Sequence, residues 1–251
     1  MAAVWRRYEE LRPDELADMV ARTPVAFWPL GLLEHHGWHL PIGFDGLKAQ
    51  ALCERVAART GGVLLPVMWW GGEGGHGCCR WTHYQRPEAA AAILDDTVGQ
   101  LLRHGFLALV LLAGHYPWQR LLDRILPRHR AAHPRALLLA GTEVSICAET
   151  VRIGGDHAAR AETSFGLALF PALVRLEALT AGRDEQAWPG GQPPPPEGRH
   201  PGVCWDPASP CFAQMGADAR TATAADGWAS LDPLVERLAA LIGQHLDALP
   251  R

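Results

Sequence analysis

Short runs of apolar residues alternate with amphipathic stretches along most of the chain. A continuous apolar run is typical of a strand buried on both faces, whereas apolar positions three and four residues apart indicate a helix buried on one side. The alternation predicts an α/β fold with a mostly parallel sheet covered by helices on both faces. The expected strands are 25–33, 63–69, 106–113 and 135–140, and the expected helices are 13–21, 47–59, one from about 87, one from 117 to about 132, 157–173 and 233–249.

Residues 188–210 break this pattern because they are rich in proline and glycine. The stretch GGQPPPPEGRHPG contains four consecutive prolines, which favour an extended, solvated backbone. We expect a loop here, within a single domain that spans residues 1–251. The loop would serve as a connector, a lid or an oligomer contact.

Composition and charge exclude several classes of protein. The formal net charge is −4, which gives no reason to expect a nucleic-acid partner, because phosphate binding needs clustered lysine and arginine. Lys48 is the only lysine, and nearly all the positive charge is arginine. No apolar run approaches the ~20 residues that span a bilayer, and the charged N-terminus does not resemble a signal peptide. The six cysteines form no CxxC pair, and we interpret them as reduced thiols of a cytoplasmic protein.

The strongest chemical signal follows the first apolar run, in the stretch EHHGWHLPIGFD. Ligands bind beyond the carboxyl ends of the strands in open α/β sheets. Glu34 and His36 are two residues apart, so their side chains point the same way on an extended backbone. With Asp45, which has two oxygens to share between ions, they predict a metal site. In the alternative interpretation Asp45 only caps a helix and the histidines lie on the surface.

Two further stretches carry candidate residues. His115 follows another apolar run in AGHYPW, although a single histidine at the end of a strand needs no function. In DHAARAETS, His157 is a candidate acid/base and Glu162 a candidate ligand. They are five residues apart, so both reach one site only if His157 lies at or before the first helical turn. Alternatively, Asp156 caps the helix and Glu162 is solvated.

Taken in order, these stretches resemble the motifs of the creatininase family. EHHGWHLPIGFD is similar to that family's E-x-H-G-x-H-L-P-x-x-x-D, and AGHYPW is similar to its N-G-H-(G/Y)-(G/E)-N. DHAARAETS resembles H-A-G-x-x-E-T-S, and GADARTATAADG resembles G-D-P-x-x-A-T-x-x-x-G. The resemblance extends from about residue 25 to 227 and implies a three-layer α/β/α sandwich that assembles into a hexamer.

The resemblance also implies roles for individual residues. The site would hold two divalent ions, and ligands of oxygen and nitrogen without a thiolate suit Zn, Mn or Fe. Pro117 stands where creatinine-cleaving members have a glutamate ligand, so Glu162 is expected to replace it and to take part in catalysis. His157 would transfer a proton. The implied metal ligands are Glu34, His36, Asp45 as the bridge, His115 and Glu162.

The chain departs from the family pattern at the expected substrate wall. Ala113 and Trp118 replace two asparagines, and CCRWTHYQRP stands where an F-P-G-T segment is usual, so creatinine is not the expected substrate. Ten tryptophans suggest a flat or aromatic ligand, although several of them would equally fill the core. The expected substrate contacts are His39, Trp70, Trp81, Tyr116 and Trp118.

Three functions follow from these observations. The first is metal-dependent hydrolysis of the C–N bond of a cyclic amide, a formamide or another small amide by an activated water. The second is a peptidase that trims a precursor peptide in cofactor or natural-product biosynthesis, which the glycine-rich loop 71–77 modestly favours. The third is a non-catalytic binding protein that retains the fold. The same loop lacks the Gly-Lys-Ser/Thr ending of a phosphate-binding loop.

Overall fold

A five-stranded sheet forms the centre of the computed structural model, which describes residues 3–183 and 185–249. The strand order is β1-β3-β2-β4-β5, and every pair of neighbouring strands is parallel. The strands are β1 (Trp5–Arg7), β2 (Val25–Leu30), β3 (Gly62–Leu64), β4 (Ala108–Ala113) and β5 (Leu137–Thr142).

The pairing of β2 with β4 positions the candidate site. All residues of both strands are buried, and they pair in register from Val25 opposite Ala108 to Leu30 opposite Ala113. Continuous apolar strands of this kind suit the middle of a parallel sheet, where helices cover both faces. The two strands end side by side, so the chains that follow them emerge at the same edge of the sheet.

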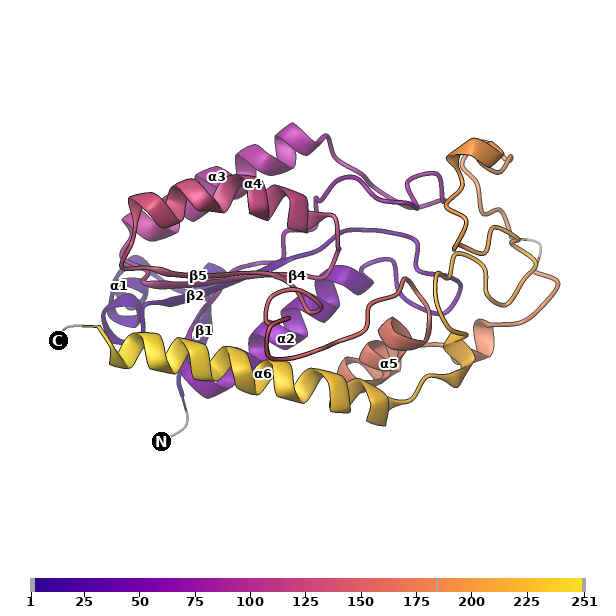
Figure 1. Cartoon of the computed structure of the whole chain (residues 1–251). Helices are drawn as coiled ribbons and strands as arrows, with labels where there is room; N and C mark the ends of the chain where they lie inside the picture. Colours follow the sequence, from indigo (N-terminus) through magenta and orange to yellow (C-terminus); the bar gives the residue numbers. More distant parts are fainter. Residues whose placement is uncertain (1–2, 184, 250–251) are drawn as a thin grey trace.

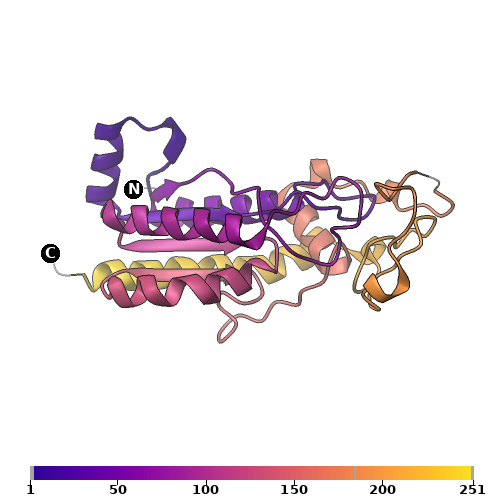
Figure 2. The same ribbon diagram turned by 90° about the horizontal axis from the view of Figure 1, so that it is seen from above.

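Helices cover the sheet on both faces, as Figures 1 and 2 show. One layer contains α2 (Phe44–Thr60) and α6 (Ala224–Asp247), whose buried apolar residues share a core with those of α5 (Arg160–Leu169). The opposite core contains apolar residues of α1 (Pro13–Arg22), α3 (Pro87–Arg103) and α4 (Trp118–Ala132). The predicted α/β/α sandwich is therefore confirmed. The described residues also form short 3-10 helices at Tyr8–Glu10, Pro171–Leu173, Leu176–Ala178, Pro196–Gly198 and Ala219–Thr221.

Several predicted boundaries were wrong. The expected strand 25–33 ends at Leu30. In place of the expected strand 63–69 the structure has the short β3, which ends at Leu64, and Met68 is an isolated bridge partner of Leu30. The strand predicted at 135–140 lies at Leu137–Thr142. The short edge strand β1 was not predicted, because its three residues include two arginines and carry no apolar run.

The helix boundaries also differ from the predicted ones. The last helix begins nine residues before the proline expected to open it, because the Thr223 hydroxyl accepts the Asp226 N–H and caps the helix there. Helix α2 starts at Phe44, so Asp45 lies inside its first turn. Helix α5 starts at Arg160 rather than at 157.

The loops between α5 and α6 extend beyond the carboxyl edge of the sheet (Figure 1). They contain the proline-rich segment, which is mostly exposed but is fixed at its ends by a small apolar cluster. The cluster consists of Cys79, Ala187, Trp188, Phe212 and Ala213. Among the residues that the structure describes, no helix is both long and apolar enough to cross a bilayer.

Candidate metal centre

Five side chains from four segments meet beyond the carboxyl ends of β2 and β4. Glu34 and His36 lie in the loop after β2, Asp45 in the first turn of α2, His115 two residues after β4, and Glu162 in the first turn of α5. None of the five is more than 5% exposed. Every metal ligand expected from the sequence therefore lies in this one cluster.

The close approach of two backbones makes this meeting possible. Gly114 packs against the peptide of Asp45, and a Cβ atom added at Gly114 would lie 1.9 Å from the carbonyl oxygen of Asp45. No side chain fits there, so a glycine is required before His115. The second motif is thus held directly against the first turn of α2.

The Asp45 carboxylate divides the cluster into two groups. Its Oδ1 lies 3.1 Å from His36 Nε2, and its Oδ2 lies 3.3 Å from His115 Nδ1. His36 Nε2 is also 3.6 Å from Glu162 Oε2, and His115 Nδ1 is 3.1 Å from Glu34 Oε2. In each group the possible ligand atoms lie within 4.8 Å of one another. Asp45 therefore stands between two sets of ligands, each with one histidine and one further carboxylate.

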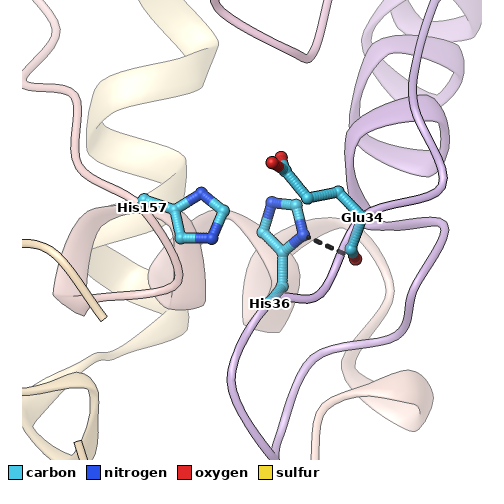
Figure 3. A group of neighbouring side chains, drawn as sticks. All are labelled: Glu34, His36 and His157. Carbon is cyan, nitrogen blue, oxygen red and sulfur yellow. Dashed lines mark hydrogen bonds between the residues drawn. The ribbon is translucent and has the colours of Figure 1, made fainter. Parts of the chain in front are cut away.

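Backbone contacts leave one nitrogen of each histidine available. His36 Nδ1 lies 3.1 Å from the carbonyl oxygen of Glu34, an acceptor, so Nδ1 carries the proton (Figure 3). His115 Nε2 likewise donates to the carbonyl oxygen of Glu73 at 2.8 Å. His36 Nε2 and His115 Nδ1 then face the carboxylates, and each would offer a lone pair to a cation once its proton is displaced. A second hydrogen bond of this kind is what usually fixes the orientation of a metal-binding histidine.

Two buried atoms of the cluster lack hydrogen bonds. Within the described part of the chain, neither His36 Nε2 nor Asp45 Oδ2 has a hydrogen-bond partner. An unpaired buried polar atom is costly, and such atoms are rare outside functional sites. Divalent cations, one in each group, would satisfy both atoms, because imidazole nitrogen and carboxylate oxygen are their ordinary ligands. The residues present therefore fit a metal centre.

The same carboxylates shift the pKa values of the histidines. Burial opposes the protonation of His36, but Asp45 and Glu162 outweigh it and raise the pKa of His36 to about 9. Burial is likewise outweighed at His115, where Glu34 and Asp45 hold the pKa well above its ordinary value. Without cations, protons balance the charge of the carboxylates.

His157 lies just before α5, which meets the condition for reaching the same site as Glu162. Its Nε2 lies 3.1 Å from the carbonyl oxygen of His35 and therefore donates to it, leaving Nδ1 as an acceptor. Figure 3 shows the His36 ring between Glu34 and the His157 ring, and the two ring centroids are 4.4 Å apart. Burial, with the charge of His36, lowers the pKa of His157 well below its ordinary value.

Glu162 is buried, so its interpretation as a solvated residue was wrong. Its Oε2 accepts the N–H of Ala158 at 2.8 Å, and its Oε1 accepts from Lys48 Nζ at 3.0 Å. Burial raises the pKa of Glu162 to about 7, although Lys48 and His36 act in the opposite direction. Asp156 does cap α5, through the N–H groups of Ala161 and Glu162.

A cavity of about 210 Å³ opens onto the cluster. Besides four of the metal-ligand candidates, all but His36, it is lined by Tyr116, an expected substrate contact, and by His157. It also reaches His200, Val203 and Met215, so the loops between α5 and α6 form part of its wall.

The other expected substrate contacts do not line this cavity. Trp118 is buried in the core, where its indole N–H donates to the carbonyl oxygen of Gly31 at 3.0 Å. Trp70 and Trp81 are 48% and 61% exposed. His39 is buried and hydrogen-bonded to Thr163. Tertiary packing rather than sequence proximity to the motifs determines where these side chains lie, and we do not propose them as substrate contacts.

Four residues around the centre were not singled out from the sequence. The Tyr84 hydroxyl donates to Glu34 Oε1 at 2.6 Å, and the His76 ring stacks on that of His157. Lys48 and Glu143 form a buried ion pair beside Glu162. The only available signals were that Lys48 is the single lysine of the chain and that His76 lies in the glycine-rich loop.

Known proteins are similar to this chain in sequence and in fold. A family model described as creatininase, creatinine amidohydrolase, matches residues 9–242. The creatinine amidohydrolase of Pseudomonas putida is 31% identical over 117 residues, or 45% of this chain and 42% of that enzyme. The chain thus matches less than half the length of that relative. The mycofactocin precursor peptide peptidase of Mycobacterium tuberculosis is 30% identical over 183 residues, or 69% of each protein.

Solved structures match almost the whole chain. A crystal structure of creatinine amidohydrolase is 28% identical, with a TM-score of 0.71 and coverage of 98% of both chains. A manganese form of creatininase is 26% identical, with a TM-score of 0.69 and coverage of 96% of this chain and 98% of that one. A zinc-zinc form of a creatininase variant has the same identity and TM-score, and covers 95% and 97%. Relatives of this fold have thus been obtained with two different divalent metals.

Proposed function

Because the chain belongs to the creatininase family, we propose that it is a metal-dependent amidohydrolase that cleaves a C–N amide bond with an activated water. The substrate would be a cyclic amide, a formamide or another small amide. The cavity of about 210 Å³ supports a small reacting group, because sites for larger organic ligands usually exceed roughly 300 Å³.

The observation that carries the proposal is that the two oxygens of the Asp45 carboxylate face two different histidines. Its oxygens lie 3.1 Å from His36 Nε2 and 3.3 Å from His115 Nδ1, in two different directions. A residue that only capped a helix would turn its oxygens toward backbone N–H groups instead. Asp45 Oδ2 has no hydrogen-bond partner among the described residues, which a bridging ligand would explain.

The arrangement supports a centre for two divalent ions. Glu34, Asp45 and His115 would hold one, and His36, Asp45 and Glu162 would hold the other. When bound, such ions supply Lewis acidity that activates a water and polarises the substrate carbonyl. Nitrogen and oxygen ligands without a thiolate suit Zn, Mn or Fe. A third group, Glu34, His36 and His157, could also hold an ion. We assign the ions to the two groups that share Asp45, because these leave His157 free for proton transfer.

We assign proton transfer to His157. Since its Nε2 donates to the His35 carbonyl, Nδ1 is an acceptor, and burial keeps the ring neutral at neutral pH. Nδ1 would take a proton from the attacking water and deliver it to the amide nitrogen as the C–N bond breaks. Glu162 would support this reaction in the same cavity, which both residues line.

A peptidase is the second candidate function. The mycofactocin precursor peptide peptidase matches a larger share of this chain than the creatinine amidohydrolase does. The cavity also opens beside His200, an exposed residue of the proline-rich segment. A peptide would place its scissile bond in the cavity and continue past this loop. Cleavage of short peptides but not of lactams or formamides would favour this candidate.

Metal content, measured by mass spectrometry, tests the proposal. We expect about two divalent ions per chain in the purified protein and their loss in Asp45→Ala. Asp232→Ala, an exposed position on α6, is the matched control and should retain both. One ion per chain would contradict the dinuclear assignment. No metal, even after reconstitution with Zn, Mn and Fe, would favour the non-catalytic binding protein.

We also propose that the chain forms a homo-oligomer, with the hexamer implied by the family resemblance as the expected size. Light scattering of the purified protein measures this directly. A monomer at micromolar concentration would contradict it.

A further inference from the structure

Lys48 lies entirely inside the protein, which is unusual for a lysine. It follows Asp45 by three residues on α2 and has an exposed fraction of 0%. Its Nζ lies 2.7 Å from Glu143 Oε1 and 3.0 Å from Glu162 Oε1. The surrounding aromatic rings, with centroids 5.2 to 5.9 Å from Nζ, belong to Phe44, Tyr116 and Phe165.

This burial is not explained by the stability of the fold. Removing an ammonium group and two carboxylates from water costs more than their attraction commonly returns, so apolar residues often serve a core as well or better. The partners of Lys48 are a candidate metal ligand and a residue bonded to the cavity wall. Its position therefore points to the centre rather than to the general core.

Lys48 fixes one end of the Glu162 carboxylate. Oε1 of Glu162 accepts from Lys48, while Oε2 accepts the Ala158 N–H and faces His36 Nε2 at 3.6 Å. With each oxygen held by a different donor, the carboxylate cannot rotate without breaking both contacts. The oxygen directed at His36 is thus held there by the ammonium group on the opposite side.

Lys48 also reaches the cavity wall through Glu143. Glu143 Oε1 accepts from Lys48 Nζ and, at 3.1 Å, from the Tyr116 hydroxyl. Tyr116 lines the cavity. One buried ammonium group therefore connects the ligand candidate on α5 with the phenol beside the reacting group.

We propose that Lys48 is a positioning residue that makes Glu162 a ligand for the ion on the His36 side. The inference rests on the two-ion centre of the proposed function and names the residue on which the second ion depends. Pro117, which has no side-chain donor, cannot supply this ligand from the second motif. Glu162 supplies it from α5, and Lys48 holds it in place.

Stepwise zinc titration of the metal-free protein against a chelator tests this role. Glu162→Gln removes a ligand of the ion on the His36 side. The ion whose affinity falls in this variant is therefore the one on that side. Lys48→Met should weaken that same ion by about 10- to 100-fold, the usual effect of removing a residue that orients a ligand. The ion held by Glu34, Asp45 and His115 should keep its affinity within about threefold.

Two controls separate positioning from a loss of structure. Arg59→Met removes a basic residue from the exposed end of the same helix, where it pairs with Glu236, and should change neither affinity. Adding Lys48→Met to Glu162→Gln should have no further effect on the second ion, because its target is already gone. Lys48→Gln, which retains a donor group, replaces Lys48→Met if circular dichroism shows that the methionine variant is unfolded.

The outcomes distinguish the two proposals. Two ions in the wild type and a selective loss in the Lys48 variant support both. Two ions in the wild type with unchanged affinities in the Lys48 variant, or with equal losses of both ions, overturn the positioning role alone. A wild-type chain that binds fewer than two ions overturns the two-ion centre and this inference with it.

Discussion

The imidazole of His76 stacks on that of His157, with ring centroids 3.7 Å apart and planes at 12° to each other. His76 belongs to the glycine-rich segment before α3, and the structure holds its backbone N–H against the Tyr84 hydroxyl at 3.1 Å. The glycine-rich loop 71–77 therefore supports the histidine to which we assign proton transfer.

We expect His76→Ala to lower the turnover number about tenfold while the metal content stays at the wild-type level. A stacked aromatic pair contributes about 0.5–1.5 kcal/mol, and losing it would let the His157 ring move. Activity on the best substrate from a set of lactams, formamides and short peptides is measured beside metal content. A loss of metal in His76→Ala would instead make this residue part of the metal centre.

Variants of the ligands and of His157 should behave differently. Glu34→Ala or His36→Ala should lose metal and activity together. His157→Ala should keep its metal and lose turnover by about 10²- to 10⁴-fold, the usual contribution of a general acid or base. Mass spectrometry and an activity assay separate these effects, and full metal stoichiometry in both ligand variants would refute the assignment.

Metal binding should release protons at neutral pH. The pKa of His36 is raised from 6.5 to about 9, so at pH 7.5 the metal-free ring carries a proton that a cation must displace. Calorimetric titration in two buffers with different ionisation enthalpies measures the number released. We expect the apparent zinc affinity to rise with pH up to about 9 and then to level off with respect to this group. Binding without proton release at pH 7.5 would contradict this.

The same shifts predict how the stability of the metal-free protein depends on pH. A pKa raised by folding stabilises the folded state below the ordinary value, and this contribution is lost as pH rises through the raised value. For His36 the loss falls between pH 6.5 and about 9, and for Glu162 it falls between pH 4.5 and about 7. Thermal unfolding in chelator should therefore show a midpoint that decreases from pH 6.5 to 9. The zinc-loaded protein should show a smaller decrease, because the cations replace these protons.

Replacement by alanine should affect the free energy of unfolding strongly at Trp118 and hardly at all at Trp81. Trp118 is 1% exposed and makes a buried hydrogen bond, so Trp118→Ala should lower the free energy of unfolding by about 3–5 kcal/mol. Trp81 is 61% exposed, and Trp81→Ala should change it by less than about 0.5 kcal/mol. Denaturant unfolding measures both, and a Trp118 variant of normal stability would contradict its role in the core.

Local sequence patterns were sufficient to place the expected ligands but not their surroundings. Glu34 and His115 follow continuous apolar runs, so their strands and the edge at which they meet follow from the order of elements. Lys48 and Glu143 are 95 residues apart, and nothing in either neighbourhood indicates that they pair. The tryptophans show the same limit, because the burial of a large amphipathic side chain depends on which helices pack around it.

Because the site lies where β2 and β4 end side by side, the proposed metal centre can form only in a correctly folded chain. The candidate ligands come from four separate segments, between residue 34 and residue 162, and the proposed centre would be complete only when all of them have docked. A slip of one residue between β2 and β4 would displace His115 by about 3.3 Å relative to Asp45. Chains in the wrong register would then bind cations weakly, and cations would select the correctly assembled chains by mass action. Metal availability during synthesis would thus influence how much of the protein reaches its native state.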